Sequence, residues 1–149
     1  MGAKRIDALL ADYGANHATR GNRNSHVVGI TLIVFGVLSM LHAVPVRDSL
    51  TASELLVVAA FLFYLTLDAG LALAVTAVAA VLDLAARGID DWRVGAAAFV
   101  VGWIFQGIGH AVYEKRSPAF FRNLVHLLIG PAFLVNEALH IRPAAPAPR

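Results

Sequence analysis

The sequence of 149 residues contains no cysteine and few charged residues. Without cysteine, the chain cannot form disulfides or thiolate metal sites, and it cannot attach haem through a CxxCH motif or use a cysteine nucleophile. Any metal must therefore be held by nitrogen and oxygen ligands. Charged residues make up only 15% of the chain, and its 12 Lys and Arg residues form no basic stripe with interleaved aromatics. We therefore expect no nucleic-acid binding.

Apolar residues dominate instead. The chain is 58% hydrophobic and has a mean hydropathy of +0.69, which is typical of membrane proteins rather than of a small soluble helical bundle, the alternative for this length. Charged residues separate the apolar runs, which approach the roughly 20 residues needed to cross a hydrocarbon core of about 30 Å. Five apolar segments can be drawn, at residues 27–44, 55–67, 69–86, 94–108 and 119–139.

These segments predict an all-α fold, an integral membrane helical bundle with about five hydrophobic helices. In lipid, a helix bonds every backbone amide within its own segment. Asp68 and Gly70 are expected to turn a hairpin between the second and third segments. Small residues recur at 69–86 and 95–109, which favours close helix packing. Residues 1–141 are predicted to form one membrane-embedded domain, and the Pro/Ala-rich residues 142–149 a flexible tail.

The distribution of basic residues predicts an orientation, because short loops rich in Lys and Arg tend to remain cytoplasmic. Two such regions flank the first and fourth segments: Lys4, Arg5, Arg20 and Arg23 before the first, and Lys115, Arg116 and Arg122 after the fourth. With five spans, both lie on the cytoplasmic side of a bacterial inner membrane or the endoplasmic reticulum. The same topology places four histidines at that face, namely His17, His26, His110 and His126, and places His42 and His140 opposite.

His17 and His26 lie directly before the first apolar segment. On an uninterrupted helix, a separation of nine residues would turn them to opposite faces, so they could not share one ion. Gly21, Asn22 and Asn24 are predicted to bend the chain and bring both imidazoles together. Asn22 is predicted to orient one imidazole through its side-chain amide. The alternative is that His26 packs at the membrane interface and His17 is solvated.

Gln106, His110 and Glu114 follow one another at a spacing of four, which places them on one slowly rotating stripe of a helix. Polar groups at membrane depth are costly, so this stripe indicates a functional site, with an interhelical hydrogen-bond network as the alternative. Glu114 is a candidate ligand or base, or an ion-pair partner of Lys115 or Arg122.

His126 is the fourth candidate ligand, with a role as an ordinary core histidine as the alternative. Pro118 is expected to interrupt the preceding helix, so that Arg122, Asn123 and His126 turn back toward the same face. Imidazoles with a possible carboxylate and no thiolate suit Fe(II), Zn(II) or Mn(II), and open positions on iron suit dioxygen chemistry.

Several short motifs occur here in a combination known from one family. The matching pieces are Tyr13-xxx-His17-xxxx-Asn22-xxx-His26-xx-Gly29, Gln106-xxx-His110-xxx-Glu114-Lys115, Pro118-Ala119, Asn123-Leu124 and Pro131-xxxxx-Glu137. On these residues, the chain resembles the iron-dependent 2-hydroxy fatty acid dioxygenases, small multispan membrane proteins whose fungal members act in phytosphingosine degradation. It departs from the family at Thr19-Arg20, where Asn-Pro is usual, and at Thr31, where proline is usual.

The resemblance implies Fe(II)- and O₂-dependent cleavage between C1 and C2 of a 2-hydroxy fatty acid, without 2-oxoglutarate, to give a fatty acid one carbon shorter. The acyl chain would extend between helices into the membrane lipid. The implied metal ligands are His17, His26 and His110, with His126 as the fourth, and the supporting groups are Asn22, Gln106 and Glu114. Cationic candidates for attracting the substrate carboxylate are Arg20, Arg23, Lys115 and Arg122.

Two other functions fit the same residues. Helical membrane bundles also hold haem between facing histidines, as electron carriers do; a Soret band in the purified protein would indicate this function. A non-enzymatic membrane scaffold or transporter is the other alternative. In that case, alanine at His17, His26 and His110 would leave metal content and lipid turnover unchanged.

Overall fold

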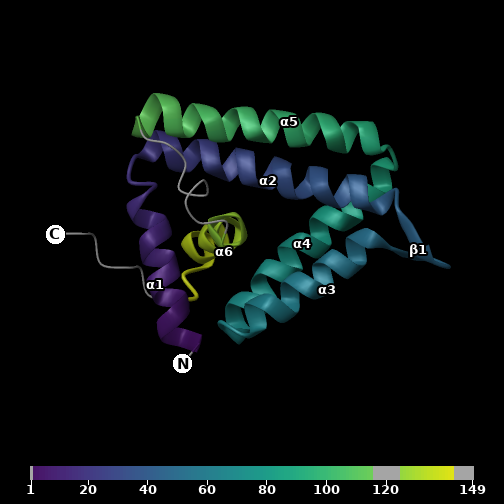
Figure 1. Cartoon of the computed structure of the whole chain (residues 1–149), viewed down its shortest axis with the longest axis horizontal. Helices are drawn as coiled ribbons and strands as arrows, with labels where there is room; N and C mark the ends of the chain where they lie inside the picture. Colours follow the sequence, from purple (N-terminus) through teal and green to yellow (C-terminus); the bar gives the residue numbers. More distant parts are fainter. Residues whose placement is uncertain (1, 116–124, 143–149) are drawn as a thin grey trace.

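The structure is a computed structural model that describes residues 2–115 and 125–142, and the described part is almost entirely helical (Figure 1). The prediction of an all-α fold is confirmed, with one unpredicted addition, a short antiparallel hairpin of β1 and β2. The elements in chain order are α1 (Gly2–Ala15), α2 (Arg20–His42), β1 (Pro45–Arg47), β2 (Leu50–Thr51), α3 (Ala52–Leu65), α4 (Ala69–Ile89), α5 (Trp92–Ile108), the π-helix η1 (Gly109–Glu114) and α6 (Val125–Leu139).

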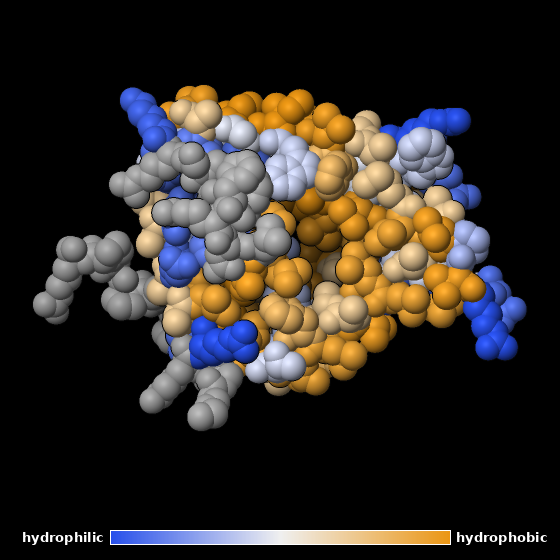
Figure 2. Space-filling view, in the orientation of Figure 1, coloured by the Kyte–Doolittle hydropathy of each residue, from blue (hydrophilic) through white to orange (hydrophobic). Residues whose placement is uncertain are grey.

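Each of the five predicted apolar segments contains a helix, although residues 119–124 of the fifth lie outside the described part. Three helical stretches are long and apolar enough to cross a membrane: Arg20–His42, Ala69–Ile89 and Trp92–Glu114. The helices α3 and α6 are apolar but shorter. Figure 2 shows hydrophobic surface across the middle of one face and hydrophilic side chains toward its ends. This distribution suits a protein whose middle faces lipid.

Side-chain caps set where two of the helices begin. The Asp68 carboxylate accepts a hydrogen bond from the Leu71 amide at 2.8 Å, so Asp68 caps α4 and is the turn residue that the sequence predicted. Thr19 caps α2 in the same way, because its hydroxyl accepts from the Asn22 amide at 3.3 Å.

The predicted position of the bend between His17 and His26 was wrong. Helix α1 ends at Ala15 and α2 begins at Arg20, so the chain breaks at residues 16–19 rather than at Gly21–Asn24. The physical reason is the Thr19 cap, which starts the helix early and leaves the glycine and both asparagines inside it. The break still lies between the two histidines, so the two imidazoles can come together as the predicted bend would have allowed.

Helices α2 and α5 lie side by side in opposite directions and pack more extensively than any other pair of elements (Figure 1). Glycines allow their backbones to meet. A Cβ atom on Gly29 would lie 2.9 Å from the Gly102 carbonyl oxygen, and one on Gly36 would lie 2.6 Å from that of Gly95. Both distances are too short for any larger residue, which confirms the close packing predicted from the small residues. This pairing brings the start of α2 beside the end of α5.

Helix α1 packs against α6 and completes the core at this end of the molecule. Ile6 of α1, Leu71 of α4 and Ile129 of α6 are fully buried in one apolar cluster. The chain after α6 is fixed to the same elements by Arg142, whose guanidinium pairs with Asp7 at 2.8 Å and with Asp68 at 3.0 Å. Arg142 is thus anchored although it begins the predicted tail, and the rest of that tail, 143–149, lies outside the described residues.

Candidate metal centre

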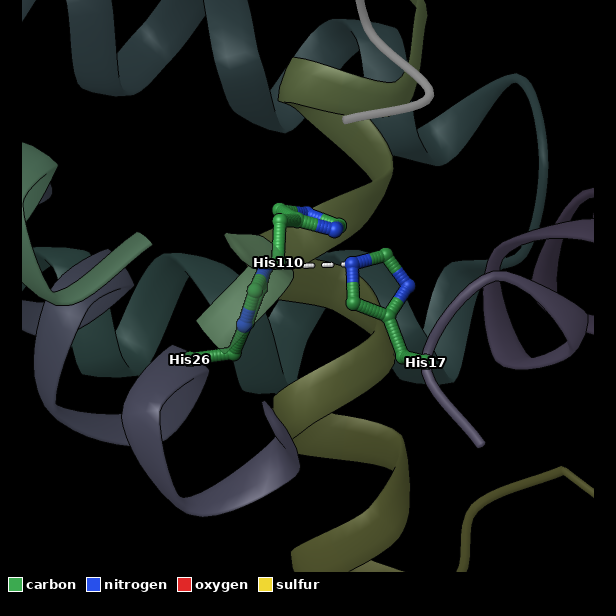
Figure 3. Close-up of side chains that lie close together, drawn as sticks. All are labelled: His17, His26 and His110. Carbon is green, nitrogen blue, oxygen red and sulfur yellow. Dashed lines mark hydrogen bonds between the residues drawn. The ribbon is translucent and has the colours of Figure 1, made fainter. Parts of the chain in front are cut away.

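Three histidines from separate elements meet where α1, α2 and η1 come together (Figure 3). His17 lies in the junction between α1 and α2, His26 on the second turn of α2, and His110 in η1. All three are at most 5% exposed, and one nitrogen of each lies within 4.8 Å of the others. His42 lies sixteen residues along α2 from His26, or about 24 Å at 1.5 Å per residue, and is not part of the cluster.

Hydrogen bonds to backbone carbonyls fix the rings of His17 and His26. The Nδ1 atom of His17 lies 2.6 Å from the Tyr13 oxygen, and that of His26 lies 2.9 Å from the Asn22 oxygen. Because a carbonyl only accepts, each Nδ1 must carry the hydrogen, and each neutral ring then presents the lone pair of Nε2. In both cases the carbonyl belongs to the residue four positions earlier.

The two Nε2 atoms face each other at 3.1 Å, along the dashed line in Figure 3. Neither carries a hydrogen when both rings are neutral, so no hydrogen bond can join them. Burial lowers the pKa of His17 to about 4, which keeps this ring neutral near pH 7. Two opposed lone pairs in a buried site repel each other, and a cation between them would remove this repulsion, so the three histidines are a candidate metal centre.

The spacing of the His17 and His26 nitrogens also fits a metal. Metal–imidazole bonds of about 2.1 Å at angles of about 90–109° separate two nitrogens by about 3.0–3.4 Å, and the observed separation is 3.1 Å. Three neutral imidazoles without a thiolate suit borderline ions such as Fe(II) and Zn(II). Three protein ligands also leave coordination positions open for a substrate, which is the arrangement of catalytic rather than structural sites.

The π-helix η1 sets the position of His110. A π-helix closes its turns with i→i+5 bonds and is therefore wider than an α-helix. Such turns are rare in proteins, and those that occur are often found at functional sites. Gly109 begins η1 directly against α2, where a Cβ atom would lie 3.1 Å from the His26 ring. The Nδ1 atom of His110 is buried and has no hydrogen-bond partner among the described residues.

Glu114 ends η1 and holds the junction that carries His17. Its Oε1 atom accepts hydrogen bonds from the Thr19 amide at 2.8 Å and from the Thr19 hydroxyl at 3.1 Å. Glu114 was predicted as a metal ligand, a base or an ion-pair partner of Lys115 or Arg122, and its role as a base stays a prediction. Glu114 is not in the three-histidine cluster and bonds to Thr19 rather than to Lys115, while Arg122, the other predicted partner, lies outside the described residues.

Asn22 and Gln106 lie beside the histidines. Asn22 is fully buried, but its backbone carbonyl rather than the predicted side-chain amide holds His26. The reason is that helical side chains lean toward the helix N-terminus, where the carbonyl four residues earlier lies. Gln106 is 7% exposed and lies one turn before His110, as the stripe predicted.

Arg23 holds the backbone of His17. Its Nε atom donates to the His17 carbonyl at 2.8 Å, and its Nη1 atom pairs with Glu137 of α6 at 2.7 Å. Both interactions engage the guanidinium, which was predicted as one of four candidates for the substrate carboxylate. The Tyr13 ring stacks on the His17 ring with centroids 4.0 Å apart. Helices α1, α2 and α6 therefore all restrain this histidine.

His126 lies outside the three-histidine cluster, which differs from its prediction as a fourth ligand. It is 6% exposed, and its Nε2 atom lies 2.8 Å from the carboxylate of Asp12 in α1. The sequence analysis missed both Asp12 and Thr19. Thr19 was detectable as a helix cap, but Asp12 gave no signal because its partner is 114 residues away in the sequence.

A cavity of about 330 Å³ opens beside the metal centre, in the size range of small-molecule sites. Apart from its histidines, its walls are largely apolar. They are formed by Tyr13, His17, His26, Ile30, Ile33, Val34, Phe99, Trp103, Gln106, His110, His126, Leu127, Gly130 and Pro131. A second cavity of about 70 Å³ shares three of these residues, namely Ile30, Val34 and Pro131.

Comparisons with known proteins identify the family of this chain. Residues 3–141 match the family described as 2-hydroxy-palmitic acid dioxygenase Mpo1-like. The chain is 34% identical over 145 residues to the 2-hydroxy-palmitic acid dioxygenase MPO1 of Saccharomyces cerevisiae, and the match covers 93% of this chain and 83% of the yeast protein. No solved structure gave a significant match. The resemblance seen in the motifs is confirmed, and the chain belongs to the 2-hydroxy-palmitic acid dioxygenase Mpo1-like family.

Proposed function

We propose that this protein is an Fe(II)-dependent dioxygenase that uses O₂ to cleave the bond between C1 and C2 of 2-hydroxy fatty acids. The products are a fatty acid one carbon shorter, CO₂ from the carboxyl carbon C1, and one water. The observation that carries the proposal is the pair of opposed Nε2 lone pairs, 3.1 Å apart beside an apolar cavity, in a chain of this family. Membership of the family supports the substrate class and the use of O₂, and the donor set is compatible with iron as the metal.

In this proposal, His17, His26 and His110 hold the iron. When bound, iron supplies a Lewis acid for the hydroxy acid head group and the redox chemistry with O₂. The backbone carbonyls of Tyr13 and Asn22 keep two of the imidazoles in the tautomer that binds metal.

The acyl chain of the substrate enters the apolar part of the cavity. Its walls there include Val34 of α2 and both Phe99 and Trp103 of α5. Burying the chain against these side chains excludes water from the head group and holds C1 and C2 beside the metal centre. Because the same helices are long enough to cross a membrane, the substrate reaches the cavity from lipid.

We further propose that the protein spans the membrane several times, with its N-terminus and metal centre on the cytoplasmic side. The support is the excess of Lys and Arg before the first and after the fourth apolar segment. The antiparallel pairing of α2 and α5 is compatible with this topology, because it brings Arg20 and Arg23 of the first basic region and Lys115 of the second to one end of the molecule.

The spacing of His17 and His26 argues against these two residues as the facing ligands of a haem. Axial nitrogens on opposite sides of a haem iron lie about 4 Å apart for bonds of about 2 Å. His17 and His26 are closer than this, at 3.1 Å.

The test is metal analysis of the full chain, purified anaerobically in detergent, followed by incubation with Fe(II), O₂ and 2-hydroxypalmitate. We expect one iron site without a Soret band, and a fatty acid of 15 carbons as the product. Omitting Fe(II) or O₂ should abolish the product. Failure to form a one-carbon-shorter product from 2-hydroxy acids of several chain lengths would overturn the proposal.

A further inference from the structure

His126 is a buried histidine of the cavity wall that the metal centre does not use. It lines the same cavity as the three clustered histidines but lies outside their cluster. Its Nε2 atom lies 2.8 Å from an oxygen of Asp12. Because an ionised carboxylate only accepts hydrogen bonds, Nε2 carries the hydrogen of this pair.

The other nitrogen of the ring is left without a partner. Nδ1 of His126 is inaccessible to solvent and makes no hydrogen bond to any described residue. Buried polar atoms without partners are uncommon and costly, so an unpartnered nitrogen in a residue that lines the cavity points to a ligand group. Asp12 is 59% exposed, but it fixes the ring so that Nδ1 faces away from the carboxylate.

The chemistry of Nδ1 selects among the groups that a 2-hydroxy fatty acid offers. A hydroxyl both donates and accepts, so it pairs with this nitrogen whether or not the nitrogen carries a hydrogen. A carboxylate pairs with it only in the protonated ring, and the methylene of an ordinary fatty acid never does. On the basis of the function proposed above, we propose that His126 recognises the 2-hydroxyl group of the substrate and that Asp12 positions the His126 ring.

This role differs from that of a fourth metal ligand, although the two share one feature. Metal-bound imidazoles commonly donate their second N–H to a carboxylate, as His126 does to Asp12. The distinguishing observation is that no nitrogen of His126 belongs to the group lying within 4.8 Å. The test must therefore measure metal binding as well as substrate binding.

The experiment compares the affinities of the full chain in detergent for 2-hydroxypalmitate and palmitate, by calorimetry. Metal-free protein is used, because chelation of iron would itself favour the hydroxy acid. One hydrogen bond corresponds to a preference of about tenfold for 2-hydroxypalmitate in the wild type. His126→Phe keeps an aromatic ring without the nitrogens and should lose this preference. His126→Asn, which places polar atoms near the position of Nδ1, should retain part of it.

Metal content provides the control for all variants. His126→Phe should bind Fe(II) like the wild type, and metal loss in this variant would make His126 a ligand and overturn the inference. If His126→Phe does not fold, His126→Gln replaces it, because Gln reaches toward Asp12 but not toward the site of Nδ1. Equal preference for the hydroxy acid in His126→Gln and His126→Asn would then overturn the inference.

The two proposals fail in different ways. If the wild type forms the shortened product and prefers 2-hydroxypalmitate while His126→Phe shows the same preference, only the role of His126 is wrong. If the wild type forms no shortened product and binds neither acid, the proposed function fails and the role of His126 falls with it.

Discussion

Two of the polar clusters in the described part of this apolar protein differ in how their groups are satisfied. The first is the group of three histidines at the start of α2. The second joins α3 to α4, where the guanidinium of Arg87 pairs with Glu54 at 2.8 Å and with Asp83 at 2.8 Å. In this second cluster, one cation lies between two anions and each charge has a partner of opposite sign.

The histidine cluster has no such internal balance. Two of its Nε2 atoms present lone pairs to each other, so a bound cation would balance the cluster, as the proposed function requires. The comparison teaches that polarity inside an apolar bundle does not by itself identify a site. A cluster that satisfies its own charges stabilises the fold, whereas one that leaves buried groups opposed is prepared to bind something.

The largest expected effect is from removing one imidazole. His26→Ala should lower the affinity for Fe(II) at least 100-fold and abolish the shortened product, because the metal loses one of three ligands. The measurement is iron per chain after anaerobic loading, together with product formation. His42→Ala, at the far end of the same helix, is the matched control and should keep wild-type iron content. Equal iron in the two variants would contradict the assignment of the cluster.

Next in size is the effect of forcing α2 and α5 apart. A methyl group at Gly102 would meet the Gly29 carbonyl at 2.7 Å, so Gly102→Ala should cost about 2–3 kcal/mol of stability and weaken metal binding. The measurements are Tm in detergent and metal affinity. A Cβ atom on Gly107 of the same helix has nothing within 4 Å, so Gly107→Ala should be stabilising by up to about 1 kcal/mol. A lower Tm for Gly107→Ala than for Gly102→Ala would contradict the packing.

Substitution of Glu114 and of Glu54 tests the difference between the two clusters further. Glu114→Ala frees the Thr19 amide and loosens the junction that carries His17, so metal affinity should fall about 10–100-fold. Glu54→Ala breaks the pair with Arg87 and should lower Tm without changing metal affinity. Metal titration and thermal unfolding of both variants test this contrast. Reduced metal affinity in Glu54→Ala would show that the two clusters are coupled.

The smallest effect is expected from the two arginines. Arg23→Gln removes the bond to the His17 carbonyl and the pair with Glu137, both partly exposed, so metal affinity should fall only a few-fold. Arg87→Gln should leave metal affinity unchanged and lower Tm, since Asp83 is only 8% exposed and loses its cation. The readouts are again metal titration and Tm, and the reverse pattern would count against the distinction between the clusters.

The fold was largely predictable because its signals are local. Apolar runs separated by charges gave five helical segments, and Asp68 followed by Gly70 gave the turn that starts α4. The small residues of α5 predicted close packing, since their effect depends on size alone. The β-hairpin was not predicted, because Pro45–Arg47 and Leu50–Thr51 are too short to show an alternating pattern.

The site was predictable in its residue types but not in its contacts. His17, His26 and His110 were candidates from their positions beside apolar runs, and the structure brings them together. His126 was grouped with them, because sequence position cannot separate a cavity wall from a metal cluster a few ångströms away. Asp12 draws His126 to α1 by a contact between distant parts of the chain, which no local pattern encodes.

The sequence by itself determined an apolar all-α protein with histidines at the ends of its hydrophobic segments and no thiolate for a metal. These properties depend on composition and on spacing along one helix, so they are visible without a structure. Only the tertiary structure decided that the Nε2 atoms of His17 and His26 oppose each other at 3.1 Å. That distance depends on the chain break that the Thr19 cap sets between the two histidines. The Gly29–Gly102 contact and the π-helix position the third histidine, His110, and metal binding is sensitive to the position of each ligand.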